Sequence, residues 1–153
     1  MSRRDQIRMS AREVGDFLAA ERVVVVATNG LGGWPHLMPL WYVLREGEIW
    51  GWTYAKSQKV RNLERDDRAT LVVETGEQYH ELRGVMLECR VVLHRDLDVV
   101  AQVGAEIFTR YGSGALGDEF MDVVRAQAAK RVALQFVPER VASWDHGKLG
   151  GVY

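Results

Sequence analysis

Two lysines and a serine lie close together in the middle of the chain, where they could hold an anion. Lys56, Ser57 and Lys59 follow an aromatic segment and begin a stretch with helical spacing. A serine at this place can cap the helix, while the N–H groups of the first turn and the helix dipole favour negative charge. Phosphate groups commonly bind at such helix ends. The pattern therefore predicts a phosphate-binding turn, to which Asn62 could contribute from the neighbouring face.

The segment before this turn is predicted to be a strand with one bulky face and one small face. Trp50, Trp52 and Tyr54 alternate with Gly51 and Thr53, and side chains alternate sides along a strand. A glycine inside a strand lets another group approach the backbone closely. We therefore expect a flat ligand to lie against the small face. The alternative is a solvated linker helix between two strands, because runs of charged residues usually face solvent.

The remaining elements must position this strand and turn. Apolar periodicity and turn residues predict helices and strands along most of the chain. The expected helices are residues 10–20, 97–111 and 118–128, and the expected strands are residues 22–28, 34–44, 49–54, 69–74, 83–94, 131–137 and 139–144. Pro35 and Pro39 mark the second strand as an edge or bulged strand. Hairpin spacing favours a mainly β fold with peripheral helices, an antiparallel barrel of six to seven strands.

Composition and length are those of one soluble domain. The 153 residues are 47% apolar and 27% charged, which is typical of a globular chain with its own core. We expect a single domain over residues 1–153, with residues 1–9 and 147–153 as flexible or surface-lying tails. The net charge of −1 argues against a nucleic-acid binder. No apolar run approaches the ~20 residues of a membrane span, so a cytoplasmic location without membrane attachment is expected.

Groups for direct acid–base, nucleophilic or metal catalysis are not recognisable in the sequence. The four histidines are far apart and form no metal-binding motif, and no serine lies in a Gly-x-Ser-x-Gly segment. Cys89 is the single cysteine and lies in an apolar run, which predicts a buried, inert thiol. No catalytic side chain is therefore assigned and no metal is expected. An enzyme with this sequence would take its chemistry from a cofactor.

Three segments together resemble the FMN-binding split-barrel superfamily that includes the pyridoxamine 5'-phosphate oxidases. They are residues 33–42, 53–68 and 130–138. Within that superfamily, residues 59–63 followed by 67–69 are most similar to the actinobacterial branch of flavin/deazaflavin oxidoreductases, many of which use coenzyme F420. The resemblance covers roughly residues 10 to 146. It implies a split barrel and a homodimer with cofactor sites at the subunit interface.

The resemblance also implies roles for individual residues. The backbone beside the ring of the cofactor would come from Met38, Pro39 and Leu40. The strand under the ring and ribityl chain would be Thr53, Tyr54 and Ala55. The phosphate would be held by Lys56, Ser57, Lys59 and Asn62. The partner chain would supply Tyr79 and His80. A substrate, or the acidic tail of F420, would meet Lys130 and Arg131, together with Lys148.

The implied function is hydride transfer between coenzyme F420 and a conjugated small-molecule substrate. The alternatives are an FMN-dependent oxidoreductase of the pyridoxamine phosphate oxidase-like type and a non-catalytic flavin- or haem-binding protein. Vitamin B6 oxidases of this superfamily end in an Arg-Leu-containing motif, whereas residues 144–149 here read Trp-Asp-His-Gly-Lys-Leu. Oxidation of pyridoxamine phosphate is therefore not expected.

Overall fold

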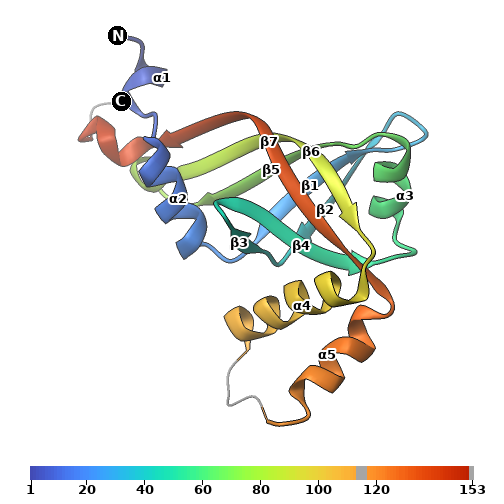
Figure 1. Ribbon diagram of the computed structural model, residues 1–153. Coiled ribbons are helices and arrows are strands. Elements are labelled where there is room, and N and C mark those ends of the chain that lie inside the picture. The colour runs from blue at the N-terminus through green and yellow to red at the C-terminus, as the bar shows by residue number, and fades with distance from the viewer. Residues whose placement is uncertain (113–116, 152–153) are drawn as a thin grey trace.

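Seven strands pair in one antiparallel sheet in the computed structural model, which describes residues 1–112 and 117–151 (Figure 1). The sheet order is β2-β1-β5-β6-β7-β4-β3. The strands are β1 (Val24–Asn29), β2 (Pro35–Leu40), β3 (Val43–Arg45), β4 (Glu48–Tyr54), β5 (Arg68–Thr75), β6 (Arg83–His94) and β7 (Arg131–Asp145). The sheet curls into a half-barrel, which confirms the predicted mainly β split barrel of six to seven strands.

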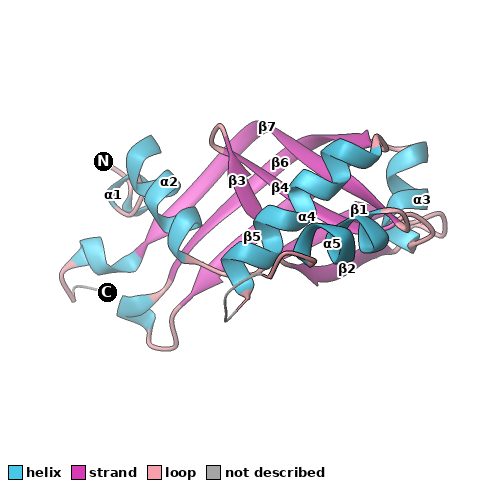
Figure 2. Cartoon of the chain, turned by 60° about the horizontal axis from the view of Figure 1, so that its bottom comes forward, coloured by secondary structure: helices cyan, strands magenta, loops and turns pink. Residues whose placement is uncertain are grey.

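Helices flank this sheet rather than interrupt it (Figure 2). They are α1 (Arg3–Gln6), α2 (Ala11–Ala20), α3 (Gln58–Arg65), α4 (Leu97–Tyr111) and α5 (Phe120–Ala128), with 3-10 helices η1 (Tyr79–Glu81) and η2 (His146–Leu149). Ser10 caps α2 in a capping box with Glu13, as its sequence predicts. Helix α5 begins two residues later than expected. None of the helices in the described part of the chain is long and apolar enough to cross a membrane.

Two apolar clusters hold the elements together. The first fills the curled sheet, where buried residues such as Val26, Leu71 and Leu134 meet α2 and α3. The second lies on the opposite side of β3, β4 and β7, where Trp50 and Ala133 pack against α4 and α5. Strand β4 thus lies between two cores. Its bulky aromatic face points toward α4, which confirms the predicted alternation along this strand.

The expected single strand over residues 34–44 is wrong, because the chain bends at Trp41 and Tyr42 to give β2 and β3. The Tyr42 side chain turns inward and is fully buried, and its hydroxyl donates a hydrogen bond to the Leu18 carbonyl at 2.6 Å. Burial of this phenol raises its pKa to about 12. Strand β2 lies at the edge of the sheet, as Pro35 and Pro39 predict.

The expected pair of strands at the end of the chain is also wrong, since β7 runs without a break from Arg131 to Asp145. Pro138 lies opposite Cys89, next to a bulge in the pairing of β6 with β7. Strand β4 pairs with β7 only as far as Phe136. Pro138 therefore lies beyond the last residue of β7 that pairs with β4, and beside the bulge between β6 and β7. A missing N–H group is tolerated at such a position.

The two ends of the described chain lie together over one end of the sheet (Figure 1). The Asp145 N–H donates to the Ile7 carbonyl at 2.7 Å. The Lys148 ammonium donates to the Arg8 carbonyl at 2.9 Å and to a Glu13 carboxylate oxygen at 2.8 Å. The hydrogen bond from Lys148 to Glu13 and, next, the one from the Ser10 N–H hold the pKa of Glu13 down at about 2. Val152 and Tyr153 of the expected tail lie outside the described residues.

Candidate cofactor site

A groove of about 520 Å³ lies between the end of β2, strand β4, the start of β7 and helix α4. Its walls are Val23, Pro39, Leu40, Trp41, Trp52, Thr53, Tyr54, Ile107 and Arg131. A groove of this volume with mostly apolar walls fits a small organic ligand. The fold thus brings together Pro39, Leu40, Thr53, Tyr54 and Arg131, which are distant in sequence and were each expected near a cofactor.

The small face of β4 is only partly open, which corrects one expectation. A Cβ atom placed on Gly51 would lie 2.7 Å from Leu40 Cδ2 and 3.3 Å from the Trp41 carbonyl oxygen. The glycine therefore makes room for the chain at the end of β2, not for a flat ligand. The open part of this face begins at Thr53, which lines the groove.

Arg131 places a positive charge at the groove between two aromatic rings. Its guanidinium carbon lies 4.7 Å from the Trp52 ring centroid and 4.1 Å from that of Tyr54. The same guanidinium donates to the Gln127 side-chain oxygen at 2.6 Å and to the Gln127 carbonyl at 3.0 Å. Cation–π contacts and hydrogen bonds thus hold the charge in one orientation, where it can attract an anionic part of a ligand.

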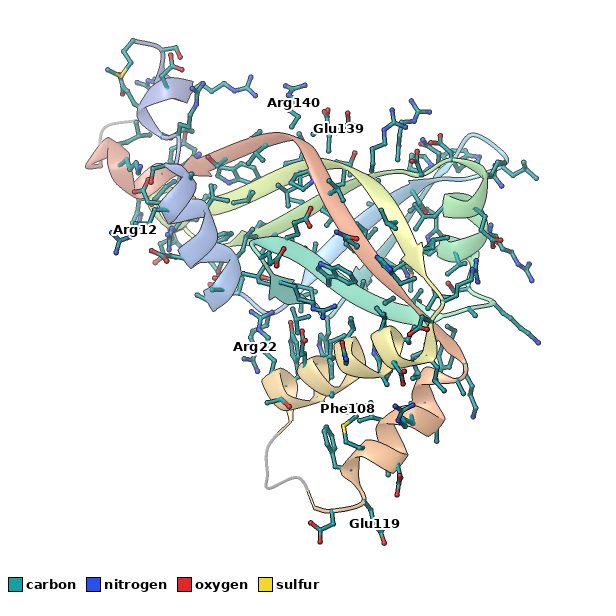
Figure 3. All side chains as sticks on the ribbon, viewed as in Figure 1. Arg12, Arg22, Phe108, Glu119, Glu139 and Arg140 are labelled. Atoms are coloured by element: carbon teal, nitrogen blue, oxygen red, sulfur yellow. The ribbon has the colours of Figure 1, made fainter. Side chains whose placement is uncertain are left out.

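Helix α4 positions the aromatic wall of the groove. The Trp52 ring lies over Gly104, where an added Cβ would come within 2.4 Å of it, and meets Phe108 edge-on at 5.9 Å between centroids. Phe108 points from α4 toward α5 (Figure 3). Tyr111 stacks on Trp41 with 4.6 Å between centroids. Sequence periodicity alone predicts these α4 residues as core, and it gives no signal that they support a ligand site.

The turn after β4 closes with the geometry that the sequence predicts. The Ser57 N–H donates to the Tyr54 carbonyl at 3.0 Å, and the Ser57 hydroxyl oxygen accepts from the Val60 N–H at 3.4 Å. The Ala55 N–H donates to the Lys130 carbonyl at 2.9 Å. Lys130 thus takes part through its backbone, while its side chain is exposed. Lys56 is also exposed, so its ammonium is free to approach an anion.

Lys59 is buried, which the sequence does not reveal. Its side chain is 5% exposed. Within residues 1–112 and 117–151 it makes no hydrogen bond or ion pair, and burial lowers the pKa of its ammonium. The Lys59 nitrogen atom keeps some contact with solvent, but a largely desolvated charge without a partner is costly. An anion bound at the first turn of α3 would offset that cost, so the structure contains a position that fits a phosphate group.

Asn62 lies deeper than Lys59 and is fully buried. Its amide nitrogen donates to Thr28 Oγ1 at 3.1 Å, and its amide oxygen accepts from Gln58 Nε2 at 2.9 Å. The side chain therefore anchors α3 to β1. A contact between Asn62 and a phosphate stays a prediction.

Tyr79 and His80 do not lie near the groove within one chain. They belong to η1, which follows the C-terminal end of β5, whereas α3 precedes the N-terminal end of this strand. Eight residues of strand span ~26 Å at 3.3 Å per residue. The Tyr79 ring lies 4.5 Å from the His146 ring, in the region of the chain ends. These two residues can reach a groove of this kind only if a partner chain supplies them.

One further residue of the predicted site, Met38, belongs to β2. Met38 is 47% exposed and pairs with Val26. Two positions before it, His36 Nδ1 is a buried atom without a hydrogen-bond partner in the described chain. Cys89 is 4% exposed, which confirms the predicted burial of this thiol, and burial raises its pKa to about 12. Among the residues that the structure describes, no three His, Cys, Asp or Glu side chains lie close enough together to hold a metal ion.

Comparison with known proteins places these features in context. The family model of pyridoxamine 5'-phosphate oxidase matches residues 10–145. A conserved hypothetical protein from Mycobacterium tuberculosis is 38% identical, with 100% of this chain and 95% of that chain covered and a TM-score of 0.91. No curated protein matches the chain.

Two more distant structures share the fold. The haem storage protein of Vibrio cholerae is 17% identical with a TM-score of 0.68, and the match covers 89% of this chain and 96% of that one. An F420 reductase is 17% identical with a TM-score of 0.66, over 83% of this chain and 94% of that one. At such identities the likeness concerns the fold alone, since one fold can carry different functions.

Proposed function

This chain belongs to the pyridoxamine 5'-phosphate oxidase family, and we propose that it is an oxidoreductase that binds a flavin-type cofactor in the groove between β2, β4 and β7. The observation that carries this proposal is the unpaired, buried Lys59 at the first turn of α3, directly after the strand that lines the groove. An anion site beside an aromatic-walled groove matches a ligand with a phosphate at one end and a flat ring at the other.

Each part of such a cofactor has a counterpart in the chain. Lys56, Ser57 and Lys59 would hold the phosphate, because two ammonium groups and the capped helix end all favour negative charge there. Residues 53–55 would lie along the ribityl chain, and residues 38–40 would lie beside the ring. The bound cofactor supplies the hydride transfer. The protein contributes position and water exclusion, which bring the reacting atoms into line.

Coenzyme F420 is the cofactor that we propose, with a conjugated small molecule as substrate. Residues 59–63 and 67–69 carry the resemblance to the F420-using branch, and one structural neighbour is an F420 reductase. The oriented guanidinium of Arg131 and the exposed Lys130 supply positive charge beside the groove. Both would suit the acidic tail of F420 or an acidic group of the substrate.

FMN is the alternative cofactor, because it carries the same ribityl phosphate and would use the same turn. A non-catalytic role as a flavin or haem binder is favoured by one observation, the structural likeness to a haem storage protein. In that role the cofactor would bind, but neither the reduced cofactor nor oxygen would react with a panel of quinones and enones.

We also propose that the active form is a homodimer. Paired positions across five strands form an outward row of apolar residues, Pro39, Val25, Val72, Met86 and Ala142. Their sequence neighbours in β1, β5 and β6 are buried in the barrel core, so this row faces the other way. A second copy on this surface would cover the row and could supply Tyr79 and His80.

Titration of the purified protein with F420 and with FMN tests the assignment. Quenching or a spectral shift of F420 fluorescence, saturating at one cofactor per chain, is the expected result. A yellow protein that releases FMN on denaturation and ignores F420 would replace F420 by FMN. If neither cofactor nor haem binds, the proposal of a cofactor protein fails.

A further inference from the structure

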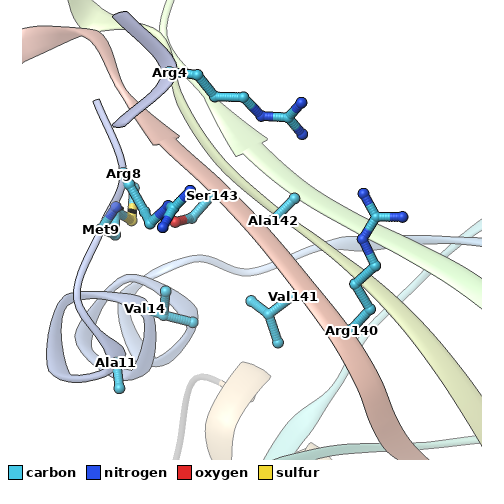
Figure 4. A pocket seen from close by; sticks show the side chains of 9 residues that line it. All are labelled: Arg4, Arg8, Met9, Ala11, Val14, Arg140, Val141, Ala142 and Ser143. Atoms are coloured by element: carbon cyan, nitrogen blue, oxygen red, sulfur yellow. Dashed lines mark hydrogen bonds between the residues drawn. The ribbon is translucent and has the colours of Figure 1, made fainter. Parts of the chain in front are cut away.

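A second groove lies between the N-terminal segment and the outer half of β7 (Figure 4). Its volume is about 710 Å³, which is within the range of small-molecule sites. Its walls are Arg4, Arg8, Met9, Ala11, Val14, Arg140, Val141, Ala142 and Ser143. None of these residues lines the groove of the candidate cofactor site, so the two grooves are separate.

The charge of this groove is one-sided. Three of its nine lining residues are arginines and none is acidic, although the whole chain carries a net charge of −1. Arg8 pairs with Asp5 at 3.0 Å and Arg140 with Glu88 at 3.4 Å, whereas Arg4 forms no hydrogen bond or close ion pair in the part of the chain that the structure describes and interacts with Asp5 only over a longer range. Arg4 and Arg140 extend along the same side of β7 (Figure 4). Their like charges would be offset by an anion between them.

The floor of the groove is aliphatic. Met9, Val14 and Val141 line it together with two alanines, and no aromatic ring among the described residues lines the groove. Val141 is 50% exposed, which leaves its apolar surface open to a ligand. A floor of flexible and branched aliphatic side chains fits a hydrocarbon chain better than it fits a stacked ring.

The walls of the groove are held in place by the rest of the fold. Strand β4 pairs with β7 only through Phe136, so the edge of β7 beyond that residue is open toward the groove. The N-terminal segment forms the opposite wall. It is fixed by the Met9 N–H, which donates to Ser143 Oγ at 3.0 Å, and by the bond from Asp145 to Ile7. The groove is therefore formed before any ligand arrives.

We propose that this groove is a second ligand site, which binds an aliphatic carboxylate of medium length. Arg4 and Arg140 hold the carboxylate, since a guanidinium presents a planar fork of donors that matches two carboxylate oxygens. The hydrocarbon chain lies on Val14 and Val141 and removes apolar surface from water. The site needs no cofactor, so it stands or fails independently of the proposed oxidoreductase activity, although its lining residue Ala142 also belongs to the apolar row of the proposed dimer.

Calorimetric titration of the full chain with octanoate tests this site. Saturable binding of one octanoate per chain is expected, with octanol and octyltrimethylammonium binding about tenfold more weakly or not at all, because they lack the carboxylate. Equal binding of octanol would show a site without charge selection and would overturn the proposal. Octyl phosphate is a further arm, and tighter binding of it than of octanoate would overturn the choice of a carboxylate.

Two sets of variants locate the site. The double variant Arg4→Gln, Arg140→Gln is expected to bind octanoate about tenfold more weakly or worse, with an unchanged melting temperature. Arg12→Gln is the matched control, because Arg12 is exposed on α2 and does not line the groove (Figure 3). Unchanged octanoate binding by the double variant would overturn the proposal. A double variant that instead loses self-association would also overturn it, and would identify a second copy as the occupant.

Discussion

Lys59 shows how much of this protein's chemistry depends on a single side chain. The residue lies at the second position of α3, between the capping Ser57 and the buried Val60. Burial lowers the pKa of its ammonium, which has no carboxylate to pair with in the described residues. A buried, unpaired charge lowers the stability of the empty protein and strengthens the hold on an anionic ligand.

Replacing Lys59 by methionine is expected to weaken cofactor binding by about 1.5–3 kcal/mol, the range for hydrogen bonds to charged groups. Methionine keeps the volume of the side chain and removes the charge. The matched control is Arg61→Met, because Arg61 is exposed on the same helix and should leave the dissociation constant unchanged. Equal affinity of the Lys59 variant and the natural chain would show that this lysine does not bind the phosphate.

The same substitution is expected to stabilise the cofactor-free protein at neutral pH. Burial lowers the Lys59 pKa from 10.5, so the folded state penalises the charged lysine. The contribution of Lys59 to stability is therefore fully present only above the unfolded-state pKa, and it is lost as pH falls through the lowered pKa. The stability gap between Lys59→Met and the natural chain should shrink as pH rises toward 10.5. Denaturant unfolding at pH 7 and pH 10 measures this gap. A Lys59→Met protein that is less stable than the natural chain at pH 7 would contradict a destabilising, desolvated charge at Lys59.

At the scale of elements, the C-terminal end of α4 fixes the bend between β2 and β3. The Arg110 guanidinium donates to the Tyr42 carbonyl and to the carbonyls of Ala19 and Glu21 at the end of α2. The Tyr111 hydroxyl accepts from the Tyr42 N–H at 3.1 Å. The backbone groups freed by the bend are thus satisfied by side chains from a distant helix. Trp41, one wall of the candidate cofactor groove, depends on this arrangement.

Arg110→Met is therefore expected to destabilise the protein by about 2–3 kcal/mol, because it removes charge-assisted hydrogen bonds to several carbonyls, two of them partly buried. Arg125→Met is the control, since Arg125 forms an exposed ion pair with Asp98 that should contribute no more than ~1 kcal/mol. Urea unfolding, fitted with the same dependence of the unfolding free energy on urea concentration, compares the stabilities of the two variants. Equal losses in the two variants would mean that the bend does not need Arg110.

Replacing a glycine by alanine should have opposite effects on stability in α4 and in α2. Gly104→Ala would place a Cβ 2.4 Å from the Trp52 ring, and such overpacking should cost about 1–3 kcal/mol. Gly15→Ala in α2 meets nothing within 4 Å and should stabilise by about 0.5–1 kcal/mol through better helix propensity. Thermal unfolding of both variants measures the contrast. A stable Gly104→Ala protein would show that Trp52 can move without cost.

At the scale of the whole molecule, the proposed site is incomplete in one chain. Residues 53–59 lie at one end of β5, and Tyr79 and His80 lie at the other. The apolar row across β2, β1, β5, β6 and β7 offers a surface for a second copy, and a two-fold axis would repeat each contact. The proposed homodimer would bury this row and complete both sites together.

Met86→Asp tests that dimer, because Met86 lies within the row, paired with Val72 and Ala142. A buried carboxylate on each side of a two-fold interface should turn the dimer into a monomer and lower cofactor affinity with it. The control is Val123→Asp on α5, where the side chain is 55% exposed. Sedimentation velocity gives the mass. A monomeric natural chain, or a Met86→Asp protein that stays dimeric, would contradict the proposed interface.

Much of the fold can be predicted from sequence because it depends on local rules. Alternation along residues 50–54 gives the two faces of β4, and Ser10 and Ser57 each begin a helix by capping it. The proline spacing in residues 35–39 indicates an edge strand. These predictions hold because they concern single elements, whose geometry is set by neighbours in sequence.

The predictions that fail concern contacts between distant elements. The bend at Tyr42 depends on Leu18, Arg110 and Tyr111, and the continuity of β7 through Pro138 depends on where β4 stops pairing. Neither is visible in a local pattern. The small face of Gly51 was expected to be open, but the curl of the sheet brings Leu40 against it.

The sequence by itself determined an antiparallel barrel with a cationic, capped turn after an aromatic strand, because strand alternation and helix capping are local properties, and its family resemblance indicated that this barrel is split. The tertiary structure alone decided that Lys59 is buried without a partner while Lys56 stays exposed. It also decided that Arg131 lies between Trp52 and Tyr54. Burial and through-space charge arise only when the sheet curls and α3 and α4 pack on it. The positions of these charges therefore follow from the fold.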